Sequence, residues 1–452
     1  MNQNAKTSAA LPVLNPNAAG IDIGATAIYV AIPQDQADPC VRRFETFTAD
    51  LLAAADWLQA TGIQTVAMES TGVYWIPLFE ILEARGLQVC LVNARHLKNV
   101  PGHKSDVEDC QWLQFLHACG LLHASFRPEQ AVCAMRSLLR HRENLVASAA
   151  THVQHMQKAL VQMNLQLHTV LSDLTGKTGL AILDAILAGE RDTKKLASLA
   201  DARIKARPET IAKSLEGYYR PEHLFALRQA LAAYRFDQHQ IAECDQQIEA
   251  MLTDFDSRIN PEQTPLPPNK QKQPRGNCLH FVEADLRTEL YRILGVDLSE
   301  IPGLGTLSIH TLFAELGPHL KAFPTAKHFC SWLGLCPTNR ISGDKILSSR
   351  TRHVKNRAAQ VLRMAAQSLW HSRSALGDYY RRMRLRLGPA GANSATAHKL
   401  ARIVYHLLTM QQSYDECVFA KEQERQRQRR ERHLRKEAIA LGFQLVPETS
   451  GV

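Results

Sequence analysis

The sequence has no apolar run of the roughly 18–20 residues that a membrane-spanning helix needs. Its first residues lack a basic start followed by an apolar core, so we expect no signal peptide. The ten cysteines include no Cys-x-x-Cys pair, and Cys330 and Cys336 near His328 have a spacing that fits no common zinc site. We therefore expect reduced, buried thiols in a cytoplasmic protein that has no membrane segment.

The chain has fewer acidic than basic residues. The 452 residues include 53 Lys and Arg against 44 Asp and Glu, which gives a net charge of +9. Hydrophobic residues make up 45% of the chain, enough for a globular protein with two or three cores. A basic globular protein favours a polyanionic partner, and nucleic acid is favoured over an anionic membrane surface.

The first part of the chain alternates between strand and helix patterns. This order predicts a mixed α/β layer fold, and an RNase-H-like sheet fits it, although a third early strand is not evident. The predicted elements are strands at 20–33 and 41–48, a helix at 50–62, a strand at 63–70, a helix at 77–86, a strand at 87–94 and a helix at 105–120.

The remainder of the chain is predicted to be mainly helical, so the overall class is α/β plus α. A heptad-like pattern in the middle region favours a coiled coil, and a stretch rich in Pro, Gln and Lys indicates a linker. The charged tail is either a solvated helix or a contact for nucleic acid or a partner. The predicted divisions are an RNase-H/RuvC-like domain at 1–127, a helical region at 128–259, the linker at 260–282, a second globular domain at 283–420 and the tail at 421–452.

Four carboxylates in the first domain indicate a metal site. Asp22 lies between two isoleucines in a strand, where a carboxylate is costly unless it is paired or binds a metal. Glu69 ends the next interior strand, and Asp106 and Asp109 share one face of a helix. Together they would form an oxygen-rich site for Mg²⁺ or Mn²⁺, suited to phosphodiester cleavage. Taken singly, each acid is better explained structurally: Asp106 could cap a helix, and Glu69 could simply end a strand.

Phosphate contacts are predicted near this site and in the second domain. His103 and Lys104 precede the helix that carries the two aspartates. Residues 301–317 resemble a helix-hairpin-helix turn, in which Gly303 and Gly305 would let backbone N–H groups approach a phosphate. A glycine turn of this kind is also common for purely structural reasons.

Residues 339–350, NRISGDKILSSR, contain a hydroxyl in a strongly basic setting. Ser342 has no adjoining His or Asp base, and Gly343 would permit close backbone approach. Ser348 and Ser349 are rival hydroxyls, and the whole stretch is alternatively a simple turn. The surrounding cations, which would bind phosphate and stabilise a transition state, are Arg340, Lys345, Arg350, Arg352, Lys355 and Arg357.

These motifs occur together in one known family. The chain resembles the insertion sequence 110 family of transposases, also described as bridge-RNA-guided recombinases. The resemblance covers both globular ends in the same order. The matching stretches are GIDIG, AMESTGVYW, HKSDVEDC, IPGLGTL, FCSWLGLCPTNRISGDKILSSRTRHVKNR and ATAHKLARIVYHLL.

The resemblance implies a RuvC-like DEDD domain joined by a coiled coil to a serine-bearing transposase domain. It implies that Asp22, Glu69, Asp106 and Asp109 hold Mg²⁺ and that Ser342 attacks DNA to form a phosphoserine link. It further implies a dimer to tetramer, in which the acids of one subunit meet the serine of another on donor and target DNA. A noncoding bridge RNA would pair with both DNAs, and the protein would act at the nucleoid.

Three residues depart from the family pattern. Ser105 stands where Thr is more usual, Cys110 where Ala is more usual, and Asp344 where a second Gly is more usual. Asp344 adds a negative charge beside the expected nucleophile. The rival hypotheses are a junction-resolving metal nuclease that uses water, and a non-catalytic binder, which four acids aimed at a phosphate disfavour.

Overall fold

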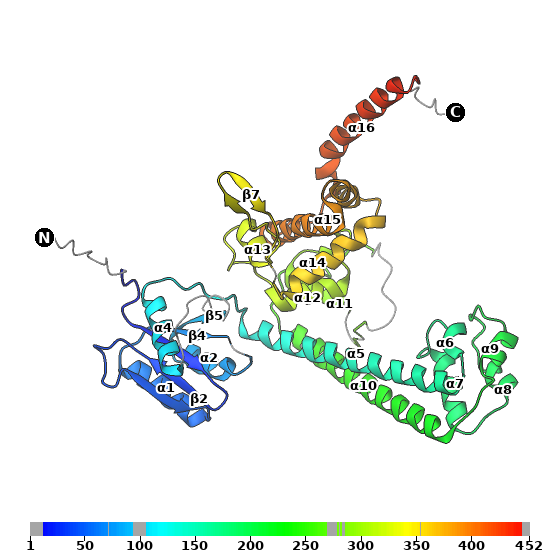
Figure 1. Cartoon of the computed structure of the whole chain (residues 1–452), viewed down its shortest axis with the longest axis horizontal. Helices are drawn as coiled ribbons and strands as arrows, with labels where there is room; N and C mark the ends of the chain where they lie inside the picture. The colour runs from blue at the N-terminus through cyan, green and yellow to red at the C-terminus, as the bar shows by residue number, and fades with distance from the viewer. Residues whose placement is uncertain are drawn as a thin grey trace. The chain divides into compact units, whose positions relative to one another are not determined.

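The computed structural model describes residues 12–70, 72–93, 105–268, 278–279, 281–282, 285–352 and 354–444. The chain divides into two compact units, Met1–Arg127 and Pro128–Val452 (Figure 1). Among the described residues, no helix is long and apolar enough to cross a membrane.

The first unit is built on a five-stranded mixed sheet with the strand order β3-β2-β1-β4-β5. The first three strands are antiparallel neighbours, while β4 and β5 run parallel to β1. With its helices this is an RNase-H-like α/β arrangement, as predicted. The strands are β1 (Ala18–Ile23), β2 (Ala27–Ala31), β3 (Val41–Glu45), β4 (Thr65–Glu69) and β5 (Gln88–Val92).

The prediction of one strand over 20–33 was wrong, because that stretch folds into the two strands β1 and β2. The N–H of Gly24 donates to the carbonyl of Ala27 (2.9 Å) and closes a tight turn between them. The turn consists of small residues within an apolar run, so the sequence pattern does not indicate a turn. The third early strand that the sequence did not reveal is therefore present, and the order is β-β-β-α-β-α-β-α.

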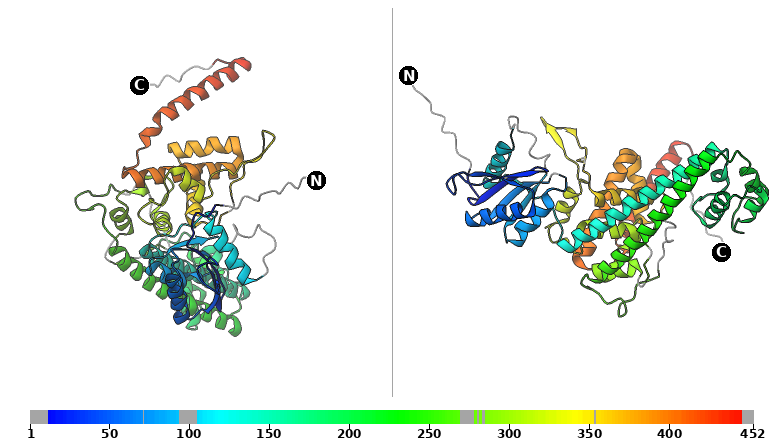
Figure 2. Two further views of the ribbon diagram at one scale, coloured as in Figure 1. Left: turned by 90° about the vertical axis from the view of Figure 1, so that its left-hand side faces the viewer. Right: turned by 90° about the horizontal axis from the view of Figure 1, so that it is seen from below.

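Helices cover both faces of the sheet (Figure 2). Helices α1 (Thr48–Ala60) and α2 (Trp75–Ala84) share an apolar core with Ile21 and Met68. Helix α4 (Asp106–Ala118) packs on β1, β2 and β4. Because side chains alternate along a strand, the residues on either side of Ile21 and Met68 face α4.

The second unit begins with two long helices that pack side by side in opposite directions (Figure 1). We call this pair, α5 (Gln130–Gln162) and α10 (Pro221–Thr253), the stalk, and each helix has 33 residues. At one end of the stalk, short helices form a lobe with its own apolar core. The lobe helices are α6 (Leu167–Val170), α7 (Lys177–Leu187), α8 (Thr193–Ser198) and α9 (Pro208–Ser214).

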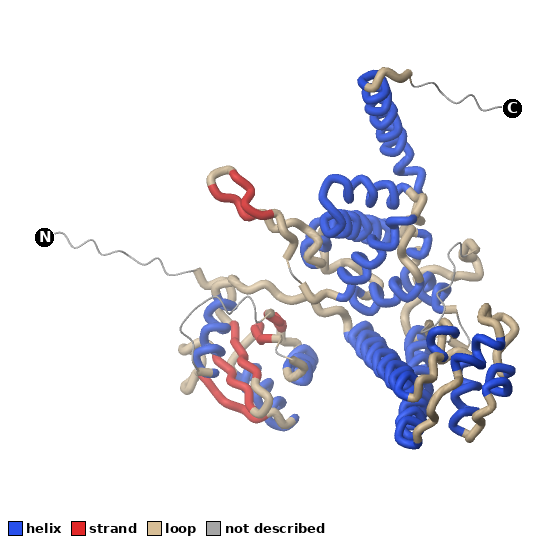
Figure 3. The backbone as a smooth tube through the Cα atoms, turned by 45° about the vertical axis from the view of Figure 1, so that its right-hand side comes forward, coloured by secondary structure: helices blue, strands red, loops and turns tan. Residues whose placement is uncertain are grey.

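The rest of this unit is mainly helical, apart from one β-hairpin, which Figure 3 shows in red. Its helices are α11 (Leu286–Leu294), η1 (Leu298–Glu300), α12 (Thr306–Leu316), α13 (Ala326–Trp332), α14 (Arg357–Ser368), η2 (Leu369–His371), α15 (Ala375–Met410), η3 (Glu416–Phe419) and α16 (Ala420–Ala440). The hairpin consists of β6 (Arg340–Ser342) and β7 (Lys345–Ser348).

Particular residues set the limits of two of these helices. After the hairpin, α14 begins at Arg357. The Asn356 side chain accepts the N–H of Ala359 (3.0 Å) and caps the helix there. Helix α15 is interrupted at Gly388, whose φ of 74° breaks the helical run just before Pro389.

Charged contacts tie the stalk to the helices that follow it. Arg142 of α5 pairs with Asp245 of α10, and both side chains are buried. Arg142 also donates to the carbonyl of Cys278 (2.9 Å). Arg140 donates to Glu315 of α12 (2.8 Å), so α5 holds α12 as well as α10.

His310 of α12 is a buried ring next to this charged contact. It is fully buried, and neither ring nitrogen has a hydrogen-bond partner among the described residues. Burial, with a smaller effect from the positive charge of Arg142, lowers the pKa of His310 to about 4. The ring is therefore neutral in the folded protein at ordinary pH.

This histidine predicts an acid-sensitive stability. Below the usual pKa of 6.5, the unfolded chain binds a proton that folded His310 accepts only near pH 4. The free energy of unfolding should therefore fall as the pH drops from 6.5 to 4, by up to about 3 kcal/mol. Urea unfolding of wild type and His310→Leu across this range measures the effect. The wild type should lose more stability than the variant, and equal losses would contradict the prediction.

Candidate active site

The sheet brings two of the four predicted carboxylates to adjacent positions. In the parallel pairing of β1 with β4, Ile21 lies opposite Met68. Asp22 and Glu69 follow directly, so they lie at the same level on neighbouring strands. Because Ile21 and Met68 face the core under α1 and α2, both carboxylates face α4.

Helix α4 carries the other two carboxylates in its first turn. Ser105 caps the helix, and its side chain accepts the N–H of Glu108 (3.3 Å). The Ser-for-Thr departure at this position therefore keeps a hydroxyl cap. Asp106 and Asp109 are exposed on α4, three residues apart. The predicted phosphate contacts His103 and Lys104 lie outside the described residues.

The position of α4 depends on Gly20, which the sequence did not single out. A Cβ at this position would lie 2.2 Å from the backbone N of Gln114 and 2.3 Å from the carbonyl O of Cys110. The helix backbone therefore rests directly on β1. Two further bonds fix it, from the Gln114 side chain to the Ala18 carbonyl (3.2 Å) and between His117 and Thr65 (2.8 Å). This packing holds the aspartates of α4 near β1.

The charges of the other three carboxylates act on Asp22. The pKa of Asp22 is raised from 3.8 to about 6, first by burial and then by the charges of Asp106, Asp109 and Glu69. No group of three or more His, Cys, Asp or Glu side chains in the described part is gathered closely enough to hold a metal ion. The carboxylates thus repel one another without closing into a coordination shell. A divalent cation would remove the repulsion, and hard oxygen ligands suit Mg²⁺ or Mn²⁺.

Ser342 lies at the end of the β-hairpin in the second unit. It pairs with Lys345 across a two-residue turn of Gly343 and Asp344. Both turn residues have positive φ, 52° and 61°, as type I′ turns require. Asp tolerates this conformation, so the Asp344 departure preserves the turn. The sequence indicated only a short polar turn here, and the strands around it were missed.

The hairpin is amphipathic and exposed. Ser342 and Lys345 form one cross-strand pair, and Ile341 and Ile346 form the next, on the opposite face. The two isoleucines are 62% and 63% exposed. In the described part, the Ser342 hydroxyl has no hydrogen-bond partner.

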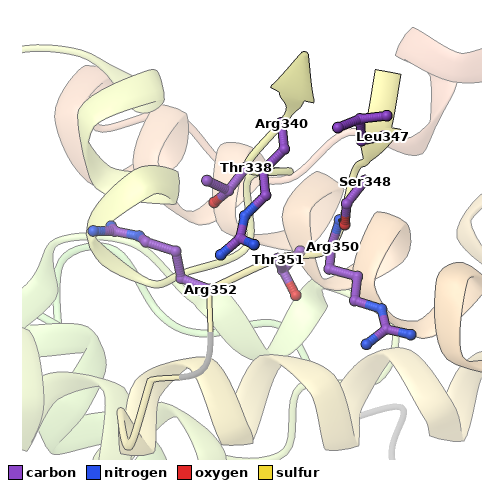
Figure 4. Close-up of a pocket in the computed structure, with 7 residues that line it drawn as sticks. All are labelled: Thr338, Arg340, Leu347, Ser348, Arg350, Thr351 and Arg352. Carbon is purple, nitrogen blue, oxygen red and sulfur yellow. The ribbon is translucent and has the colours of Figure 1, made fainter. Parts of the chain in front are cut away.

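A basic cavity of about 560 Å³ lies at the base of the hairpin (Figure 4). Arg352 is fixed there, because it donates to the carbonyl of Ser331 (2.6 Å). The guanidinium groups of Arg340 and Arg350 have no carboxylate partner among the described residues. The cavity is lined by Thr338, Arg340, Leu347, Ser348, Arg350, Thr351 and Arg352. Two arginines without a carboxylate partner in the described part, one arginine held by a backbone carbonyl and several hydroxyls suit a phosphate group.

The other predicted phosphate contacts have different surroundings. Lys355 is exposed, whereas Arg357 forms an ion pair with Glu143 of α5. Gly303 precedes α12 with a φ of 93°, and a Cβ there would lie 2.8 Å from the Ala365 carbonyl O. Gly303 is thus explained by packing. Gly305 is the N-cap of α12, with open space around its Cα.

Family models match the region that carries the carboxylates and the region that carries Ser342. Residues 19–165 match the DEDD transposase domain of the IS110 family, and residues 297–381 match the model described as Transposase IS116/IS110/IS902 family. The chain belongs to the IS110 family of transposases. No curated protein matched the chain.

Membership confirms that the protein is a DNA transposase, an enzyme with DNA as its substrate. A DEDD transposase domain implies dependence on a divalent metal ion, which fits the oxygen-only set of Asp22, Glu69, Asp106 and Asp109. The match at 19–165 begins within β1 and ends at the far end of α5, and so includes all four carboxylates. The match at 297–381 includes the hairpin with Ser342.

The repulsion among the carboxylates predicts how neutralising Asp22 changes the thermal stability of the metal-free transposase. Asp22→Asn should raise the melting temperature of the metal-free protein by roughly 3–6 °C, the shift that about 1 kcal/mol produces in a domain of this size. Adding Mg²⁺ should stabilise the wild type more than the variant. Thermal unfolding with and without Mg²⁺ measures both effects. Asp35→Asn, at an exposed loop position, should change neither, and a destabilised Asp22→Asn would contradict the prediction.

The close approach at Gly20 predicts a loss of activity that exceeds the loss of stability. Gly20→Ala must displace the α4 backbone and with it Asp106 and Asp109. DNA cleavage should fall by about a hundredfold or more, because misplacement of about 1 Å can have that effect.

The matched control is Val30→Ala, which opens a cavity on the opposite face of the same sheet. Cleavage at a temperature well below both melting points should be retained in this control. If the two variants lose activity in proportion to their stability, Gly20 has no special role in placing α4.

Proposed function

We propose that this transposase cuts and rejoins DNA through a covalent link between Ser342 and a DNA phosphate. Asp22, Glu69, Asp106 and Asp109 would hold Mg²⁺, or Mn²⁺, for this reaction. The observation that carries the proposal is the placement of Asp22 and Glu69 at the same level on neighbouring strands that face α4, in a chain whose two matched regions include these acids and Ser342. Burial and the charges of the other three acids raise the pKa of Asp22. Such crowding is costly in a structural site and useful in one that binds divalent cations.

The carboxylates would act by binding and orientation. When bound, divalent metal ions activate the attacking oxygen and stabilise the leaving oxygen of a phosphodiester. The backbone contact at Gly20 keeps α4 close to β1, so the acids of the strand and of the helix can act together. The burial of Asp22 excludes water from one side of the site.

Ser342 is suited to be the nucleophile because its hydroxyl is exposed at the end of a hairpin and has no partner in the described part. In the first step the Oγ–P bond forms while the bond from phosphorus to one deoxyribose oxygen breaks. The serine hydroxyl loses its proton, and the freed sugar oxygen gains one. In the second step a sugar hydroxyl of another strand attacks the phosphoserine, and Ser342 is released. Bond energy is conserved, so no ATP is needed.

The cavity at the hairpin base would hold the strand during these steps. Arg340 and Arg350 reach a phosphate without breaking an existing ion pair. Arg352, fixed to Ser331, would set the position of the bound group. Lys345, across the turn from Ser342, would place a positive charge beside the reacting phosphate.

The carboxylates and Ser342 belong to different units of the chain, so the reaction requires them to meet on one DNA phosphate. The resemblance supports a dimer to tetramer in which one subunit supplies the acids and another the serine. It also supports a noncoding bridge RNA that pairs with donor and target DNA. The net charge of +9 suits a protein that binds several nucleic acid strands at once.

The decisive experiment is a search for a covalent protein–DNA adduct. The protein would be expressed with its native flanking DNA, so that any guide RNA is made, and assayed with Mg²⁺ on a denaturing gel. Wild type should form the adduct, whereas Ser342→Ala and Asp22→Ala should each reduce it by at least about a hundredfold. Ser349→Ala, an exposed hydroxyl of the same hairpin region, should retain it.

DNA nicking that survives Ser342→Ala would overturn the serine mechanism. It would leave a metal nuclease in which water attacks and the hairpin only binds phosphate.

A further inference from the structure

A second cavity, of about 720 Å³, lies in the C-terminal part of the second unit. It is formed by the last turns of α15, the segment that follows α15 and the first residue of α13. Its lining shares no residue with the cavity at the hairpin base. Neither Ser342 nor the carboxylates contribute to it, so it has no part in the proposed reaction.

Aromatic and aliphatic side chains form much of its wall. Tyr405, Tyr414 and Phe419 line the cavity, together with Ile403 and Val418. Rings offer flat faces on which a planar group can stack. Val418 is 73% exposed, so the cavity is open to a ligand on that side.

Positive groups lie beside the rings. Lys399, Arg402 and His406 all line the cavity. The ammonium of Lys399 is 4.3 Å from the centre of the Tyr379 ring and 4.6 Å from that of Phe419. Arg402 has no carboxylate partner in the described part of the chain. Arg402 therefore keeps its positive charge available for an anion.

One polar atom in the wall lacks the partner that burial normally requires. The buried hydroxyl of Tyr414 has no hydrogen bond among the described residues. The hydroxyl of Tyr405, by contrast, donates to the Phe323 carbonyl (2.8 Å). Burial, with the nearby charges of Glu416 and Asp415, raises the pKa of Tyr414, so it remains a proton donor. Tyr414 lines the cavity, so a turn of its ring would bring the hydroxyl to a ligand that offers an acceptor.

We propose that this cavity binds one unpaired nucleotide of a nucleic acid strand. The base would stack among Tyr405, Tyr414 and Phe419, and its phosphate would lie against Lys399 and Arg402. Planar rings, a buried donor and nearby cations together match a nucleotide rather than an apolar peptide. A base within a duplex is already stacked, so the ligand must be single-stranded.

The acidic residue of the lining is compatible with this ligand. Asp415 is exposed and already accepts the N–H of Cys417 through Oδ1 (2.8 Å). Its charge is therefore partly satisfied and open to water. Lys399 and Arg402 line the same cavity, so the lining carries more positive than negative charge.

The test uses the full-length protein and short labelled oligonucleotides of equal charge. Fluorescence anisotropy would measure the affinity for oligouridine RNA, for oligothymidine DNA and for abasic DNA. The wild type should bind at least one base-bearing strand about 5- to 150-fold more tightly than the abasic strand, as stacking of about 1–3 kcal/mol per base implies. The RNA and DNA arms show which strand the site prefers.

Two bulky variants make the test specific. Val418→Trp fills the cavity from an exposed position, so folding should survive, and the preference for bases should fall at least threefold. Ile439→Trp adds the same bulk at a position of α16 that is 72% exposed and outside the lining, and should leave the preference unchanged. An unchanged preference in Val418→Trp for both RNA and DNA, or an equal loss in Ile439→Trp, would overturn the proposal.

Discussion

The contact between the α4 backbone and β1 at Gly20 is the constraint on which the carboxylate site depends. With no side chain between them, helix and strand come close enough for the charges of Asp106 and Asp109 to reach Asp22. The same closeness destabilises the folded protein, because like charges repel and Asp22 is partly shielded from water. The fold therefore carries a repulsion that a bound cation, or the loss of one negative charge, relieves. Burial of the large apolar core on the other face of the sheet offsets this destabilisation.

In the described part of the chain, the hairpin that carries Ser342 is held only at its base. A two-stranded hairpin is marginally stable alone, and this one exposes two isoleucines to solvent. It is anchored at its base, where Pro337 pairs with Thr351 and Arg352 reaches Ser331. The end of the hairpin is thus free while its base is fixed. A side chain at the end of such a hairpin can contact another surface and keep its orientation.

Much of the carboxylate site could be predicted from sequence. An acid between two isoleucines must face away from the core they enter, and the structure places Asp22 in that way. Two aspartates three apart on a helix share a face wherever that helix lies. Gly20 could not be predicted, because a glycine in a strand shows its purpose only when the neighbouring helix is in place.

Other features could not be predicted, because the local sequence pattern was uninformative or indicated a different structure. The turn between β1 and β2 is made of small residues within an apolar run, so it looked like continuous strand. The hairpin around Ser342 is polar and basic, and its strands are only three and four residues long. An alternation of apolar and polar residues cannot be recognised over so few positions. His310 and the cavity around Tyr414 depend on residues distant in sequence, and no short motif reveals them.

The stalk has a consequence for how the chain can change in length. Its two helices have 33 residues each and lie side by side, with Arg142 and Asp245 buried between them. An insertion in one helix alone would move its apolar positions out of register with those of the other helix. It would also separate Arg142 from Asp245. Viable insertions and deletions should therefore arise in matched pairs, near whole heptads, each altering the reach of the lobe by about 10 Å. Evolution can tune this distance in steps but not continuously.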